Sequence, residues 1–259
     1  MMVKSLEAFY ESHKDKKITD LLDRLSLSLI EFDDRAGGEE AFREILLTQD
    51  FKELNPTLNE AEIEELVGQK IGNHMDKLKT AEEEWGSIKH SVESLELEDQ
   101  QILIEFLLLN IVYSGPSIDL DTLAGRKSYL IVYNAEFALI NMFDETHVEN
   151  WVKQQGSGLT QGLIHIIESN SYELDNVINY IIWLFGVRGS PDAVDTLIDC
   201  ISNPRQGEFA YEDVILPALE ALVKIGIPAI EPLEILLSKS NWEFLHKELK
   251  EALETITNN

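Results

Sequence analysis

Apolar residues recur every three or four positions along most of the chain, which is the spacing of one face of an α-helix. The first such stripe comprises Ile18, Leu21, Leu22, Leu25, Leu29 and Phe32. The segment 39–47 repeats the pattern with three further apolar residues, Phe42, Ile45 and Leu46. This period predicts helices, and it sets the expectation of an all-α fold.

A longer and more polar helix is predicted from about 58 towards 92. Thr57 and Glu60 have the spacing of a capping box at its start. Glycine is a poor helix former, and this stretch contains three glycines, so we expect a break near one of them. They are Gly68, Gly72 and Gly86.

Two segments in the middle of the chain are apolar nearly all round, which is typical of buried helices. The first covers about 98–113 and is followed by Ser114-Gly115-Pro116, where proline ends the helix and glycine allows a reversal. The second covers about 129–143, and the short joint 154–158 follows it. A strand is a weaker interpretation of 129–133, because the helical spacing continues through Phe143.

Two stretches near the C-terminus repeat each other. GSPDAVDTLIDCI at 189–201 and GIPAIEPLEILL at 226–237 align with an offset of about 36 residues, a period typical of helical solenoids. The preceding segments 177–187 and 214–225 also match in kind.

The residues of these turns explain the repeat. Gly189 and Gly226 allow a chain reversal, and a proline follows each glycine near the first helical position. We expect Ser190 to cap the next helix of the first copy. Ala193 and Ala229 are small enough to let helices approach closely.

The shared Gly-x-Pro-(x)-Ala-(Val/Ile)-(Asp/Glu)-x-Leu pattern resembles the HEAT-like repeats found in phycobilisome lyases and many scaffold proteins. The resemblance covers about 170–240 and implies an α-solenoid. We therefore expect an irregular helical N-terminal region at 1–96 and a HEAT-like repeat region at 97–259. The segment 241–256 is predicted to be the terminal capping helix, with Ser240 and Glu243 in capping-box spacing.

The chain of 259 residues has a net charge of −27, which argues against nucleic acid as a partner. Residues 1–30 are neutral and 100–143 carry −2, whereas 31–99 carry −13 and 144–259 carry −12. Two interpretations stay open: a buried middle between ordinary solvated faces, or an acidic surface that binds a basic protein.

The repeat region contains a candidate partner-binding strip. Its acidic members lie on the second helix of each repeat, which lines the concave face of a solenoid. They are Asp192, Asp195, Asp199, Glu231 and Glu234. Trp242 lies near a helix start and is expected to be half exposed, as a contact residue. An ordinary solvated face is the alternative.

Motifs for chemistry are incomplete. SIDLDTLAG at 117–125 lacks the pattern of a phosphotransferase, so we expect Asp119 or Asp121 to cap the next helix. AGRKS at 124–128 and GSG at 156–158 lack the spacing of a P-loop and a nucleophile elbow. The pairs His90–Glu93 and His165–Glu168 have a spacing that could share a metal ion, but a metal site needs further ligands that the sequence does not place beside them. We predict no catalytic residue, cofactor or metal.

Cys200 is the single cysteine, which excludes an intrachain disulfide, and we expect it to be a small buried residue. Trp183 is expected in the core. The longest apolar runs, 102–113 and 177–187, are too short to span a membrane, and the start has no apolar stretch of signal-peptide length. We expect a cytoplasmic protein without a membrane partner.

These observations favour a non-catalytic protein-protein interaction module or scaffold. Its acidic surface binds a basic protein, and an inhibitor or immunity-type protein is one concrete form. The alternative that the resemblance implies is a lyase- or chaperone-like HEAT protein that acts on a tetrapyrrole-bearing protein. A DNA-repair relative would need a basic groove, and the acidic balance opposes it. The oligomeric state is left open.

Overall fold

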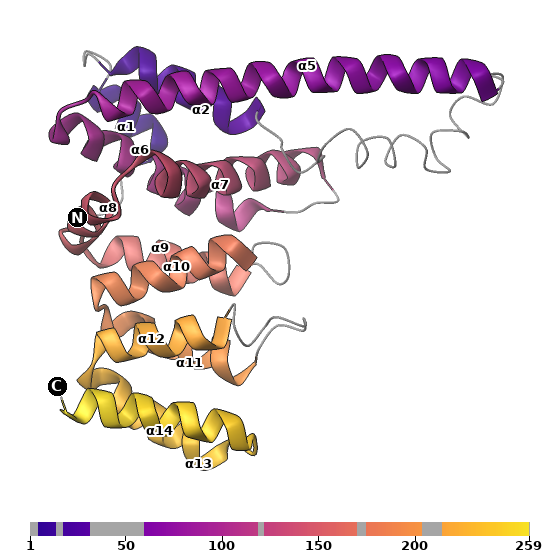
Figure 1. Ribbon diagram of the computed structural model, residues 1–259. Helices are drawn as coiled ribbons and strands as arrows, with labels where there is room; N and C mark the ends of the chain where they lie inside the picture. The colour runs from indigo at the N-terminus through magenta and orange to yellow at the C-terminus, as the bar shows by residue number, and fades with distance from the viewer. Residues whose placement is uncertain are drawn as a thin grey trace. The chain divides into compact units, whose positions relative to one another are not determined.

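The computed structural model describes residues 5–13, 18–31, 60–118, 122–169, 175–203 and 214–258. These ranges contain helices and turns but no strand, so the predicted all-α fold is confirmed. The helices are α1 (Leu6–His13), α2 (Thr19–Glu31), α5 (Glu60–Glu93), α6 (Leu97–Ser114), α7 (Leu123–Met142), α8 (Glu145–Lys153), α9 (Ser157–Ser169), α10 (Asp175–Arg188), α11 (Val194–Ser202), α12 (Leu216–Ile225), α13 (Ile230–Lys239) and α14 (Glu243–Asn258) (Figure 1).

Contacts between residues divide the chain into two compact units. The first comprises Met1–Thr19 and Leu95–Asn259, and the second comprises Asp20–Ser94. Within the described ranges, no helix is both long enough and apolar enough to cross a membrane.

The second unit contains α5 and all of α2 after its first residue. The apolar stripe predicted for α2 is buried, with each member at most 7% exposed: Leu21, Leu22, Leu25 and Leu29. Phe32 and the segment 39–47 lie outside the described residues, as does Thr57 of the predicted capping box.

Helix α5 runs unbroken over 34 residues, so the expected break at a glycine is wrong. A Cβ atom at Gly68, Gly72 or Gly86 would meet no heavy atom within 4 Å, so no packing demand bends the helix at these positions. Each glycine costs about 1 kcal/mol of helix propensity, and the neighbouring residues are mainly good helix formers such as Glu, Lys, Gln and Leu. The helical ladder therefore continues through all three.

Helix α6 is the buried centre of the first unit, as its apolar sequence predicts. The side chains of Ile104, Leu107 and Ile111 are fully buried. Helix α1 packs on it, with the ring centroids of Phe9 and Phe106 5.8 Å apart. Helix α7 also packs along α6, and it includes 129–133, so the helical interpretation of that segment is confirmed.

Helix α6 ends at Ser114, as predicted, and the 3-10 turn η2 (Gly115–Ser117) follows. The expected role of Gly115 in a reversal is wrong, because its φ of −51° is right-handed. Instead, a Cβ atom there would lie 2.7 Å from Cγ1 of Ile166 on α9. Glycine is needed at this position for close packing between segments.

The cap of α7 also differs from the expectation. Residues 119–121, which include Asp119 and Asp121, lie outside the described part of the chain. The N-cap residue is Thr122, whose hydroxyl oxygen accepts a hydrogen bond from the Gly125 N–H at 3.0 Å. Thr122 is therefore the residue that satisfies the free N–H group in the first turn.

Two rows of helices form the C-terminal half of the first unit. Helices α9, α11 and α13 contact one another in succession, and so do α10, α12 and α14. The rows also contact each other, with α9 on α10, α11 on α12 and α13 on α14. Figure 1 shows these three pairs as successive layers.

The turns before α11 and α13 confirm the predicted role of their glycines. Gly189 has a φ of 62° and Gly226 has a φ of 82°, conformations that favour glycine. A 3-10 turn follows each glycine: η3 (Pro191–Ala193) and η5 (Ile227–Ala229). Ala193 and Ala229 have no exposed surface. Two segments of similar sequence therefore share a glycine with positive φ, a 3-10 turn and a following helix, although the first has one more residue between the glycine and the 3-10 turn.

The expected capping role of Ser190 is wrong, because its side chain makes no capping hydrogen bond. Its hydroxyl oxygen instead accepts a hydrogen bond from the Thr160 hydroxyl on α9 at 3.2 Å, and both residues are buried. A buried hydroxyl needs a partner, and the nearest one comes from a neighbouring helix.

The capping box expected at Ser240 and Glu243 is also wrong. Helix α14 begins at Glu243, while Ser240 is the C-cap of α13. The Ser240 hydroxyl accepts from the Trp242 N–H at 3.3 Å, and its carbonyl oxygen lies 2.5 Å from Nε2 of His246. Ser240 therefore joins the end of one helix to the start of the next.

Candidate functional site

The acidic residues of the predicted strip all lie on the surface. Asp195 and Asp199 are exposed on α11, and Asp192 is exposed on the preceding turn η3. Glu231 and Glu234 are exposed on α13, which packs beside α11. The opposite face of each helix is buried and contains residues such as Leu197 on α11 and Leu233 on α13. The structure thus brings four of the carboxylates onto two neighbouring helices and the fifth, Asp192, onto the turn before the first of them.

Few positive charges accompany these carboxylates. Within 189–203 and 226–240, Lys239 is the single basic residue. Asp199 accepts a hydrogen bond from the Asn203 side-chain amide at 2.7 Å, which holds its carboxylate at the end of α11. The acidic strip is defined here as Asp192, Asp195, Asp199, Glu231 and Glu234. The two segments that carry it therefore contain five carboxylates and one ammonium group.

Large apolar side chains are exposed on α13, on α14 and on the short link between these two helices. Trp242 is 50% exposed, so the expected half exposure is confirmed. Ile235 on α13 and Phe244 on α14 are similarly exposed at 45% and 43%. Exposed aromatic residues of this kind are the usual anchors of protein interfaces.

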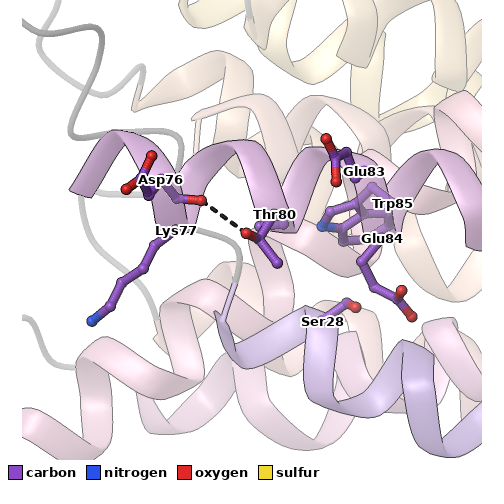
Figure 2. A pocket seen from close by; sticks show the side chains of 8 residues that line it. Ser28, Asp76, Lys77, Thr80, Glu83, Glu84 and Trp85 are labelled. Atoms are coloured by element: carbon purple, nitrogen blue, oxygen red, sulfur yellow. Dashed lines mark hydrogen bonds between the residues drawn. The ribbon is translucent and has the colours of Figure 1, made fainter. Parts of the chain in front are cut away.

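The second unit contains a pocket of about 750 Å³ between α2 and α5, which the sequence does not predict. Its lining residues are Ser28, Asp76, Lys77, Thr80, Ala81, Glu83, Glu84 and Trp85 (Figure 2). The sequence contains one indication of this pocket. Ser28 is a polar residue on the buried side of an apolar helix, where it is 7% exposed.

Arg24 joins the two helices at the edge of this pocket. Its Nε donates to Oε1 of Glu84 at 2.7 Å, and its Nη2 donates to the Ser87 hydroxyl at 2.8 Å. The hydrogen bond to Glu84 raises the pKa of Arg24. Because the guanidinium is held at two points, it fixes the position of the Glu84 carboxylate.

A buried carboxyl group lies in the first unit. Glu136 on α7 is 7% exposed, and burial raises its pKa to about 7. Tyr180 on α10 is also buried; its pKa is raised by burial and by the charges of Glu136 and Glu145. The ring of Tyr180 stacks on Trp183 with centroids 5.2 Å apart. Trp183 is half-buried, so its expected place in the core is wrong.

The other candidate chemical groups are scattered. Nδ1 of His90 lies 4.0 Å from Oε2 of Glu93, and both side chains are well exposed. His165 contacts Ser169 at 3.2 Å. Among the described residues, no three His, Cys, Asp or Glu side chains lie close enough to hold a metal ion. Cys200 is half-buried rather than buried as expected.

No protein-family model matches this chain, and no curated protein or solved structure is significantly similar to it.

Proposed function

We propose that this protein is a non-catalytic binding module, built as a HEAT-like α-solenoid, that holds a basic protein against the acidic strip. The two rows of helices support the solenoid, because each helix contacts the equivalent helix of the next layer. The matching turns at Gly189 and Gly226 support a structural repeat.

The observation that carries the proposal is the exposure of five carboxylates on α11, α13 and η3 beside a single lysine. A surface of one charge accelerates the approach of an oppositely charged partner, and exposed aromatic side chains then add contact energy. Trp242 and Phe244 supply those anchors. An inhibitor or immunity-type protein that covers a basic enzyme is the concrete form that we favour.

The test begins with immobilised full-length protein in a lysate of the cells that produce it. A basic protein that is released by raised salt is identified and purified. Its association rate is then measured against wild type and against the triple variant Asp195→Lys, Asp199→Lys, Glu231→Lys. We expect association at low salt to slow by about tenfold or more, with a weaker salt dependence.

A matched control separates the acidic strip from net charge alone. The triple variant Glu93→Lys, Glu98→Lys, Glu254→Lys makes the same change in net charge at exposed residues of α5, α6 and α14. We expect it to keep most of the wild-type rate. Equal slowing by both variants, or by neither, would show that the acidic strip is not the docking surface.

A further inference from the structure

The pocket between α2 and α5 lies within 20–94 and shares no residue with the acidic strip. Its volume of about 750 Å³ falls within the range of sites that hold small organic molecules, roughly 300–1,000 Å³. Its walls combine apolar surface from Ala81 and Trp85 with hydroxyl, carboxylate and ammonium groups. This mixture is typical of a site that orients a ligand through a few polar contacts.

Ser28 is the residue that α2 contributes to the described lining of the pocket. Only 7% of the residue is exposed, and part of its side chain borders the cavity. A hydroxyl at such a place can donate one hydrogen bond and accept others, so it can orient a small molecule in the cavity.

Glu84 supplies a carboxylate that is already in position. Arg24 holds its Oε1 atom at 2.7 Å, and no hydrogen bond within the described residues occupies Oε2. In Figure 2 the side chains of Glu84 and Ser28 both enter the space between the two helices. A donor group placed between them would therefore meet an acceptor on each side.

The charge around the pocket selects the ligand. Three carboxylates line it, those of Asp76, Glu83 and Glu84, against the ammonium of Lys77 and the guanidinium of Arg24 at its edge. The two segments 20–31 and 60–94 together contain twelve acids and five bases. This field favours a cation over an anion. The described carboxylates do not converge as metal ligands do, so the fitting cation is an organic one.

We propose that this pocket binds a small organic ammonium ion. The ammonium group donates hydrogen bonds to the Ser28 hydroxyl oxygen and to Oε2 of Glu84. The apolar part of the ligand packs against Ala81 and Trp85. Arg24 positions Glu84 for this contact.

Isothermal titration calorimetry of the full-length protein with tryptamine tests the site. The comparison ligand is indole-3-propionate, which has the same indole ring but a side chain that ends in a carboxylate. We expect saturable binding of tryptamine and none of the anion. Glu84→Gln should weaken tryptamine binding by about tenfold or more, because it removes a charged hydrogen bond. Ser28→Ala should weaken it several-fold.

The control is Glu82→Gln, which makes the same charge change at an exposed residue of α5 outside the pocket lining. It should bind tryptamine as wild type does, and circular dichroism should show equal helix content in all variants. The proposal is overturned if millimolar tryptamine gives no saturable heat, if both indoles bind equally, or if Glu84→Gln and Glu82→Gln bind alike. None of these results bears on the acidic strip.

Discussion

Gly186 of α10 and Ala221 of α12 lie so close that a Cβ atom on the glycine would be 3.0 Å from the Ala221 Cα atom. Backbone of a packed helix moves less readily than a flexible side chain. The contact between these two helices, which lie in successive layers, therefore depends on the absence of a side chain at position 186.

Gly186→Ala should lower the free energy of unfolding, although alanine favours helix. The gain in helix propensity is about 1 kcal/mol, and the added methyl group costs about 1–3 kcal/mol through overpacking. Gly86→Ala is the matched control, because its Cβ would meet no atom within 4 Å. Urea denaturation should show Gly86→Ala as the more stable variant; the reverse order would contradict the close contact.

The buried hydrogen bond between Thr160 and Ser190 should contribute to stability. Thr160→Val keeps the shape but removes the donor, so it leaves the Ser190 hydroxyl unpaired at a loss of about 1–2 kcal/mol. Adding Ser190→Ala removes that unpaired group. Denaturant unfolding of the two single variants and the double variant should therefore give a double-variant loss smaller than the sum. Additive losses would mean that the hydroxyls do not interact.

Stability should depend on pH through Glu136. Burial raises its pKa from 4.5 to about 7 in the folded state. Below pH 4.5 both the folded and the unfolded states hold the proton, so burial has no ionic cost. Between pH 4.5 and 7 the unfolded state releases the proton first, and the free energy of unfolding falls by about 3 kcal/mol in total.

Glu136→Gln should therefore match wild type near pH 4 and exceed its free energy of unfolding by up to about 3 kcal/mol at pH 8. Urea titrations at several pH values measure the difference. Glu254→Gln, at an exposed position of α14, is the control and should follow the wild-type curve. Parallel curves for Glu136→Gln and wild type would show that Glu136 is ionised in the folded protein at the same pH as in the unfolded one.

Trp242 should dominate the quenching of tryptophan fluorescence by acrylamide. It is 50% exposed, whereas Trp85 and Trp151 are 6% and 9% exposed. Trp242→Phe should therefore lower the quenching constant clearly, and Trp151→Phe should leave it unchanged or raise it. A quenching constant that survives the loss of Trp242 would place the exposed indole elsewhere.

Local sequence patterns account for the helices and for the turns before α11 and α13. Periodic apolar residues predict α2, α6 and α7 because a helix buries one face or, at the centre, all of them. The turns at Gly189 and Gly226 are predictable because a positive φ is a local demand that glycine meets. These are properties of neighbouring residues, so periodicity and composition suffice.

Which polar groups meet depends on the packing of segments that are distant in the sequence. Arg24 and Glu84 are separated by 60 positions, and Thr160 and Ser190 by 30. The burial of Glu136 also depends on distant residues, because the sequence of its own helix does not reveal which other segments cover it. Hydrogen bonding and burial depend on atoms that distant segments bring together. For this reason the sequence predicts Ser190 as a local cap, whereas its hydroxyl pairs with Thr160 of another helix. The pocket beside Ser28 likewise depends on how α2 and α5 pack together.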